Sequence, residues 1–198
     1  MVSAPSGTGK TSLVHALLDG TDNLVASVSF TTRAPRAGEQ HGRDYYFVSE
    51  DEFRSRIKTG DFFEHAVVFD KYYGTSRRMV TEQLQQGRDV VLEIDWQGAR
   101  QIRAAMPDSC SIFILPPSRQ VLEQRLRNRN QDSDEQIARR LRDAREEMSH
   151  YAEYDYVVFN DDFDTALQEL QAIVRCGRLR CAAQAMRHHA LLAELLAP

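Results

Sequence analysis

Short apolar segments, rich in β-branched and aromatic residues, alternate with amphipathic helical patterns along most of the chain. This alternation predicts an α/β domain with a parallel sheet. The expected strands are Leu24–Phe30, Val90–Ile94, Ile112–Leu115 and Tyr156–Phe159. The expected helices between them are Lys10–Leu18, Ser76–Gln86, Gln97–Met106 and Ser118–Asn128.

The segment between Thr31 and Tyr73 has a different pattern. Short strand-like runs occur at Tyr45–Val48, Phe62–Phe69 and Tyr72-Tyr73, and Ser49 with Glu52 indicates the start of a brief helix. We therefore expect an inserted, mostly antiparallel subdomain.

The C-terminal part is expected to be mainly helical. Ser133 with Gln136 forms a capping box for a helix that runs toward Met148. After Asp162 the apolar spacing predicts one long helix that packs on the sheet and continues along the surface through residues 178–187.

Composition limits the class of protein. The chain of 198 residues has 42% hydrophobic and 27% charged residues, which is typical of a folded globular domain. Its apolar runs are far shorter than the ~20 residues that cross a bilayer, and no secretory signal is recognisable. A net charge of −4 argues against a general nucleic-acid binder. The three cysteines form neither a zinc motif nor a disulfide framework, so we expect a cytoplasmic protein without membrane or nucleic-acid partners.

The strongest single motif lies at the N-terminus, where Ala4-Pro5-Ser6-Gly7-Thr8-Gly9-Lys10-Thr11 is similar to the phosphate-loop pattern, with Ala4 in place of its first glycine. Its glycines let backbone amides converge on phosphate oxygens, Lys10 adds a cation, and Thr11 can ligate Mg²⁺. The alternative is a glycine-rich turn with a solvated lysine. Only residues 1–3 precede the loop, so we hypothesise that the natural chain begins upstream of Met1.

Two acids follow the apolar run at residues 90–94. Glu93 and Asp95 would lie beside the phosphate loop and hold Mg²⁺ through water molecules. Asp95 could equally be the cap of the following helix. The sequence leaves these two interpretations open.

Several motifs in order make the chain similar to the guanylate kinase family. They are Thr31-Thr32-Arg33-Ala34-Pro35-Arg36, Tyr72-Tyr73-Gly74-Thr75, Ile94-Asp95-Trp96-Gln97-Gly98, Ile114-Leu115-Pro116-Pro117-Ser118 and Val158-Phe159-Asn160-Asp161-Asp162. The resemblance implies a single domain whose phosphate-loop core, a three-layer structure on a parallel sheet, spans 1–30 and 76–198. A GMP-binding insertion at about 31–75 and a helical lid at about 126–140 complete it.

The resemblance also assigns roles on the acceptor side. Arg33, Arg36, Tyr45 and Tyr73 match the residues that clamp the acceptor phosphate, which charge-assisted hydrogen bonds can hold. Glu64 could accept from both N–H groups on one edge of guanine, a pair that adenine lacks. Ser29, Thr75 and Asp95 match the remaining guanine-side positions. Each of these residues taken alone has an ordinary structural explanation, and only their joint order favours the functional one.

On the donor side the resemblance implies binding of ATP and Mg²⁺. The nucleotide-binding residues would be Ala4, Pro5, Ser6, Gly7, Thr8, Gly9, Lys10, Thr11, Ser12, Arg125 and Asn160. Lys10, Arg33, Arg129 and Arg140 would be catalytic, and Thr11 with Glu93 would form the metal site. Two positions depart from the family pattern, namely Asn130, where glycine is usual, and Glu93, where aspartate is usual.

The sequence thus predicts transfer of the γ-phosphoryl group of Mg·ATP to GMP, giving ADP and GDP. One rival is a guanylate-kinase-like module that has lost catalysis and binds phosphopeptides, although such modules typically lack an intact phosphate loop. Another is a related kinase of a phosphorylated sugar, against which the residues around Glu64 argue. Whether copies of the chain form a homo-oligomer is left open.

Overall fold

A computed structural model describes residues 1–68, 70–128 and 134–197. Its central feature is a parallel sheet in which β1 (Val2–Ser3) pairs with β8 (Ile112–Leu115), and β8 pairs with β9 (Tyr156–Phe159). A second parallel pair joins β2 (Leu24–Ala26) to β7 (Asp89–Val91). A parallel bridge between Val2 and Glu93 connects the two groups, so that β1 lies between β7 and β8.

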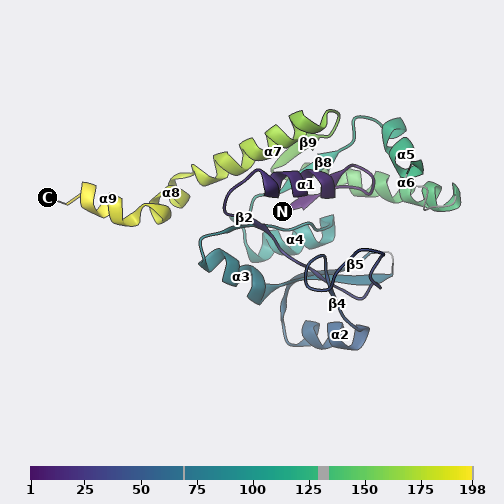
Figure 1. Cartoon of the computed structure of the whole chain (residues 1–198), viewed down its shortest axis with the longest axis horizontal. Helices are drawn as coiled ribbons and strands as arrows, with labels where there is room; N and C mark the ends of the chain where they lie inside the picture. Colours follow the sequence, from purple (N-terminus) through teal and green to yellow (C-terminus); the bar gives the residue numbers. More distant parts are fainter. Residues whose placement is uncertain (69, 129–133, 198) are drawn as a thin grey trace.

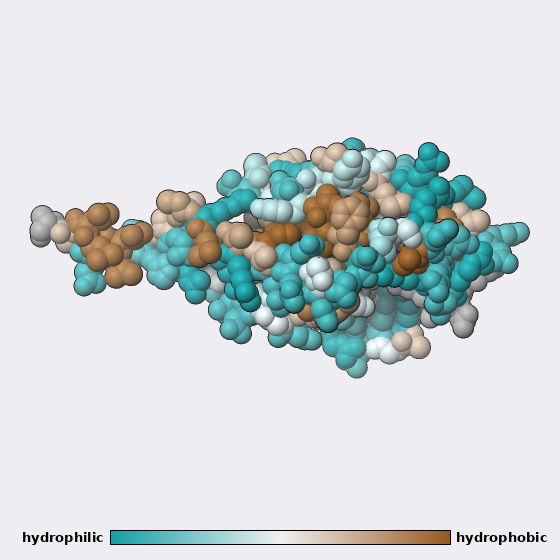
Figure 2. All heavy atoms as spheres, turned by 90° about the horizontal axis from the view of Figure 1, so that it is seen from above, coloured by the Kyte–Doolittle hydropathy of each residue, from teal (hydrophilic) through white to brown (hydrophobic). Residues whose placement is uncertain are grey.

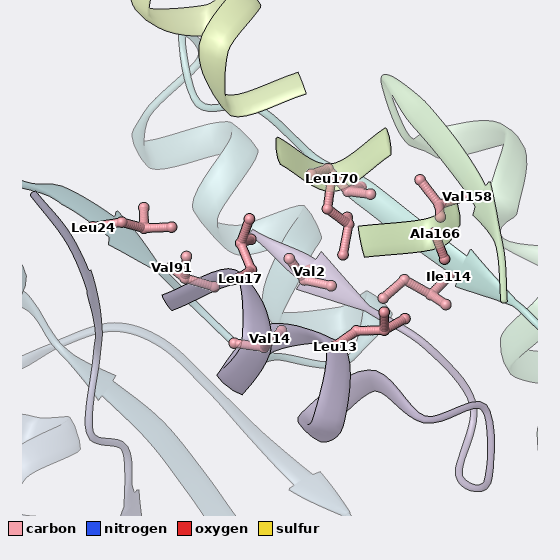
Figure 3. Close-up of a cluster of buried hydrophobic side chains, with 11 residues drawn as sticks. Val2, Leu13, Val14, Leu17, Leu24, Val91, Ile114, Val158, Ala166 and Leu170 are labelled. Atoms are coloured by element: carbon pink, nitrogen blue, oxygen red, sulfur yellow. The ribbon is translucent and has the colours of Figure 1, made fainter. Parts of the chain in front are cut away.

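Helices cover both faces of this sheet. On one face, α1 (Lys10–Asp19) and α7 (Phe163–Arg178) bury Leu13, Leu17 and Leu170 against strand residues such as Ile114 (Figure 3). On the other, α3 (Arg77–Gln85) and α4 (Trp96–Ala105) pack around Phe113. Because successive strand residues point to opposite faces, Ile112 and Ile114 enter one cluster and Phe113 the other. The result is the three-layer α/β structure that the sequence predicts.

Residues 30–76 form a second sheet of mixed topology. Its strand order is β4-β3-β6-β5, with β3 (Phe30–Thr31) parallel to β4 (Tyr46–Phe47) and the other pairs antiparallel. The longer strands are β5 (Phe62–Val68) and β6 (Lys71–Ser76). Helix α2 (Glu50–Lys58) adds Phe53 to a small aromatic core of its own, and Figure 1 shows this unit on one side of the molecule.

The remaining helices lie toward the C-terminus. They are α5 (Arg119–Arg127), α6 (Asp134–Ser149), a 3₁₀ turn (Tyr151–Glu153), α8 (Cys181–Arg187) and α9 (His189–Leu195). Helices α5 and α6 share a core of Leu122, Leu126, Ile137 and Ala144. Figure 1 shows α8 and α9 projecting away from the body, with the C-terminus at their tip. Ser133 of the predicted capping box lies outside the described residues.

Two predicted elements are wrong. The single strand Leu24–Phe30 is divided, because the chain leaves the parallel sheet after Ala26 and joins the second sheet at Phe30. The change of partner is direct: Ser27 N–H donates to Val91 at 2.9 Å, whereas the Ser29 carbonyl accepts from Tyr46 at 2.9 Å.

The single long helix after Asp162 is three helices. Its first break follows Arg178, whose guanidinium bonds Asp89 and the Asp22 carbonyl, both at 2.7 Å, and so ties the end of α7 to the sheet. Arg180 then adopts an extended conformation (φ −56°, ψ 141°), and His188 (φ −112°, ψ 26°) separates α8 from α9.

Candidate functional site

One cavity of about 290 Å³ connects the phosphate loop with the inserted sheet. Its wall brings together residues that are far apart in sequence. They are Ala4, Pro5, Ser6, Gly7, Thr8, Gly9, Lys10, Thr11, Ser29, Arg36, Tyr45, Glu64, Ala66, Val68, Tyr73, Glu93, Ile94, Asp95 and Glu147. Most of the predicted site residues therefore line a single space.

The phosphate loop is held in a conformation that needs glycine. Gly7 has φ +93° and Gly9 has φ +90°, both in the left-handed region that residues with a Cβ rarely adopt. The Thr8 hydroxyl donates to the Pro5 carbonyl at 2.9 Å and closes the turn. Helix α1 begins directly afterwards at Lys10, so its unpaired N-terminal amides face the cavity end of the loop. An anion is the natural ligand of such a terminus.

Asn160 and Arg125 fasten this loop from behind. The Asn160 amide donates to the Thr8 carbonyl at 2.6 Å, and Arg125 donates to the same carbonyl at 3.3 Å and to the Asn160 carbonyl at 3.1 Å. A Cβ on Gly9 would come within 2.6 Å of the Asn160 amide nitrogen, which leaves no room for any other residue there. Neither Asn160 nor Arg125 lines the cavity. Their predicted contact with the nucleotide stays a prediction, and their observed contacts hold the loop.

Lys10 meets three carboxylates in the cavity. Desolvation lowers the pKa of its ammonium group, and the charges of Glu93, Glu147 and Asp95 oppose that shift. Burial raises the pKa of Glu147 to about 7, against the opposing effect of Lys10. The phosphate end of the cavity is therefore rich in acids around one lysine.

Thr11 and Glu93 form a small oxygen-rich group beside the loop. The Thr11 hydroxyl donates to the Glu93 carboxylate at 3.3 Å. Within the described ranges no three His, Cys, Asp or Glu side chains converge as a metal-binding group. A pair of oxygen ligands nonetheless fits Mg²⁺, which keeps several waters and takes few protein ligands when it binds together with phosphates. Glu93 is long enough to make this contact although the family pattern has aspartate there.

Glu64 is a buried carboxylate at the opposite end of the cavity. It lies on β5 with only 3% of its surface exposed, and Thr75 on β6 donates to it at 2.5 Å. Burial raises its pKa to about 7, and the charge of Asp95 adds to the shift while the bond from Thr75 opposes it. Thr75 is itself fully buried and does not line the cavity, so its predicted role at the guanine side stays a prediction.

A β-bulge sets the direction of Glu64. The register with β6 shifts between Phe62 and Glu64, which places Phe63 as an extra residue. Phe62 accordingly packs in the aromatic core of the inserted sheet, whereas Glu64, two residues later, faces the cavity. Asp95 completes this end: it caps α4 by accepting from the Gly98 N–H at 2.8 Å, and it also lines the cavity. The structure thus confirms Asp95 as the cap of α4, and its role in holding Mg²⁺ stays a prediction.

The loop after β3 presents its two arginines differently. One guanidinium nitrogen of Arg33, Nη2, donates to both carboxylate oxygens of Glu39 at 2.7 and 2.9 Å, and Arg33 does not line the cavity. This pairing lowers the pKa of the Glu39 carboxyl. Arg36 does line the cavity, together with Tyr45 and Tyr73, whose rings meet edge to face at 6.0 Å.

The remaining predicted site residues are not part of the cavity wall that the structure describes. Ser12 is exposed in the first turn of α1 and Arg140 is half-buried on α6, and neither lines the cavity. Arg129 and Asn130 lie outside the described residues.

Comparison with known proteins gives consistent results. A family model described as guanylate kinase matches residues 1–176. The chain belongs to the guanylate kinase family. It is 57% identical to a guanylate kinase of Salmonella typhimurium, with 100% of this chain and 96% of that protein covered. It is 59% identical to one of Methylococcus capsulatus, with 99% and 96% covered.

A solved structure agrees with the fold. The crystal structure of guanylate kinase from Anaplasma phagocytophilum superimposes with a TM-score of 0.78 at 35% identity, covering 98% of this chain and 93% of that one. Membership of the guanylate kinase family makes this chain an enzyme that uses nucleotide substrates. The phosphate loop opens into the cavity, which makes this cavity the candidate nucleotide site.

Two acids that lie close to predicted site residues carry no recognisable sequence motif. Glu39 is an ordinary loop acid until the fold sets it against Arg33. Glu147 has a weak signal, because it falls on the buried side of α6 beside Ala144 and Met148, where a charged residue is unusual.

Proposed function

We propose that this cavity transfers the γ-phosphoryl group of Mg·ATP to GMP, giving ADP and GDP. The observation that carries the proposal is that the phosphate loop and the buried Glu64 line one cavity. The acceptor phosphate is largely dianionic at neutral pH, since the second pKa of a phosphate monoester is near 6. An anionic oxygen can attack directly, so the site needs no general base.

On the donor side, the amides of the phosphate loop and Lys10 would bind the ATP phosphates. Thr11 and Glu93 would hold Mg²⁺, directly or through water, and the ion supplies charge neutralisation for those phosphates. The charges of Glu93, Glu147 and Asp95 offset the positive charge of Lys10. The site should therefore bind the ATP phosphates most favourably together with Mg²⁺.

On the acceptor side, Arg33, Arg36, Tyr45 and Tyr73 would hold the GMP phosphate. Arg33 would reach it by sharing or leaving Glu39, its partner in the loop. Glu64 would accept from both N–H groups on the guanine edge, supported by Ser29, Thr75 and Asp95. Adenine offers no such pair of donors and would leave the buried carboxylate unsatisfied, which is the costly kind of mismatch.

We further propose a division of the domain by role. The core would comprise 1–30 and 76–198, the insertion at about 31–75 would bind GMP, and the segment at about 126–140 would be a lid that carries Arg129 and Arg140. Arg125 and Asn160 would contact the donor nucleotide in addition to holding the loop. A closed lid would exclude water and favour transfer over hydrolysis of ATP.

The test is production of ADP from ATP with GMP, AMP, UMP or CMP as acceptor. GMP should react at least about 100-fold faster than the other three. Equal rates with all four acceptors, or ATP hydrolysis without an acceptor, would contradict the role of Glu64. No turnover at all would point instead to the inactive binding module, which the intact Lys10 and the similarity to guanylate kinases do not favour.

We also propose that the enzyme works in the cytoplasm as a homo-oligomer, without nucleic-acid or membrane partners. Among the helices described, none has the length and apolar character to cross a bilayer. The projecting C-terminal segment of α8 and α9 exposes Met186, Leu191 and Leu195, and Leu196 directly after α9 is exposed as well; Figure 2 shows hydrophobic atoms over this end. Exposed apolar surface of this kind is typical of an interface. Sedimentation of the full chain should show a species larger than the 22.6 kDa monomer.

A further inference from the structure

Gly98, in the first turn of α4, lies against the carboxylate of Glu64. A Cβ added at Gly98 would come within 2.6 Å of Glu64 Oε2 and 3.1 Å of its Cδ, and the next neighbour would be Ile94 Cβ at 3.3 Å. Real Cβ atoms essentially never approach other atoms as closely as 2.6 Å. Because Gly98 has no side chain, Oε2 of Glu64 can occupy the space beside it.

Helix α4 is fixed where this contact occurs. The Gly98 N–H donates to Asp95 Oδ1 at 2.8 Å. One turn later, Gln101 donates to the His65 carbonyl at 2.8 Å and accepts from the His65 N–H at 3.1 Å. Residues three apart on a helix share a face, so the face that carries Gly98 is bonded to the residue that follows Glu64. A methyl group at position 98 would clash with Glu64. Moving α4 away to remove this clash would break those hydrogen bonds.

The other side of the Glu64 carboxylate is fixed as well. Thr75 is paired with Glu64 in the ladder between β5 and β6, and its hydroxyl donates to Oε1. Oε1 of the carboxylate thus accepts a hydrogen bond from Thr75 on β6, and Oε2 packs against Gly98 in the first turn of α4. Displacement of Oε2 would rotate the whole group and pull Oε1 away from Thr75.

We propose that Gly98 is a specificity-determining positioning residue, which keeps the Glu64 carboxylate where it reads the guanine edge. This inference rests on the proposed role of Glu64 in binding GMP. The atoms nearest to an added Cβ belong to the end of the Glu64 side chain, which can turn without moving α4 or β5, so the cost to folding is limited to the bond from Thr75. Alanine is also the better helix former. Gly98→Ala therefore separates specificity from stability.

The experiment measures steady-state kinetics and thermal unfolding of Gly98→Ala. The KM for GMP should rise about 10- to 100-fold, as expected when a hydrogen bond to a charged group is lost. The KM for ATP should stay unchanged, the preference for GMP over AMP should fall, and the melting temperature should stay within about 4 °C. Gly177→Ala is the matched control, since Gly177 is also inside a helix and an added Cβ there meets nothing within 4 Å. It should change none of the kinetic constants.

A second measurement links the effect to Glu64 itself. Glu64→Asp withdraws the carboxylate by one methylene, so adding Gly98→Ala to that variant should raise the KM for GMP only slightly further. Such non-additivity is the sign of a direct interaction. An unchanged KM for GMP in Gly98→Ala, or an equal increase in both backgrounds, would overturn the inference. Loss of the proposed function is distinguishable, because the unaltered enzyme would then form no ADP with GMP.

Discussion

The phosphate loop and the wall formed by β5 and β6 meet at one cavity but are held by different kinds of interaction. The loop is shaped by main-chain conformation, with positive φ angles at Gly7 and Gly9 and a carbonyl at Thr8 clamped from behind by Asn160. The opposite wall is shaped by side-chain contacts. Glu64 is positioned there by the Thr75 hydroxyl on β6 and by the space beside Gly98 on α4.

This difference has a chemical reason. Phosphate groups are the same in every nucleotide, so a cradle of backbone amides serves them and need not discriminate. A base is distinguished by the pattern of donors and acceptors on its edge, which a side chain such as the Glu64 carboxylate can complement. The two regions also differ in the free-energy cost of burying charge. The loop presents unpaired N–H groups, whereas the other wall buries a carboxylate whose pKa is about 7.

The largest expected effect is on the donor side. Lys10→Ala should lower kcat about 10²- to 10³-fold, because a positioned charge at the transferring phosphoryl group is lost. GMP binding, measured by calorimetry, should stay unchanged. Lys58→Ala, at an exposed lysine of α2, is the control and should leave kcat as it is. An unchanged turnover number in Lys10→Ala would remove this residue from the mechanism.

On the acceptor side, Glu64→Gln should stabilise the fold at neutral and alkaline pH. The folded-state pKa of about 7 lies above the usual 4.5, so the native state takes up a proton in between and its free energy of unfolding falls as pH rises through this window. Gln removes that cost. The gain should be near zero at pH 4.5 and should reach about 3 kcal/mol above pH 7.

Urea unfolding at several pH values measures this gain. Glu82→Gln, at an exposed acid of α3, should change stability by less than about 0.5 kcal/mol at any pH. A Glu64→Gln enzyme that is less stable than the unaltered one at pH 8 would contradict the burial cost. The same variant should lose its preference for GMP.

Protonation of Glu64 should also weaken the use of GMP. The neutral acid has lost the negative charge that takes both guanine donors, so kcat/KM for GMP should fall by up to about tenfold per unit as pH decreases below 7. Glu147 has a similar pKa at the phosphate end of the cavity, and Asp95 lies near both acids. The pH profile of Glu64→Gln separates them, since any acid limb that persists in it belongs to a group other than Glu64.

The smallest effect is expected for Asn160, which holds the phosphate loop from the side away from the cavity. Asn160→Ala removes one of two bonds to the Thr8 carbonyl and leaves the longer one from Arg125. The KM for ATP should rise about tenfold, as expected for loss of one hydrogen bond, while the KM for GMP stays the same. A parallel rise in both constants would mean that the loop is not held independently of the acceptor wall.

The fold was predictable where local pattern and tertiary role agree. Ile112–Leu115 is apolar throughout because the strand is covered on both faces, and its bounds are as predicted. The prediction failed where strand propensity continues across a change of partner, as at Ser27, which bonds to Val91 before the chain turns into the other sheet. It failed again after Arg178, where helical spacing persists but a tertiary ion pair with Asp89 coincides with the end of the helix.

The candidate site shows the same division. The phosphate loop could be found from residues alone, because the spacing of Gly7, Gly9 and Lys10 is itself the geometric requirement. Arg36, Tyr45 and Glu64 were found through a family resemblance and do line the cavity. Glu39 could not be found in either way, since an acid in a loop has no distinguishing pattern until its partner is known. Glu147 has only the weak signal of an acid on the buried side of a helix.

The amino-acid sequence by itself determined the alternation of strands and helices and the glycine and lysine positions of the phosphate loop, because both are patterns of residues close together along the chain. Only the tertiary structure decided that Glu64 is buried, that Thr75 and Gly98 confine it, and that Arg33 is paired with Glu39. These are contacts between separate elements. Their energies depend on distance and desolvation, which the order of residues does not state.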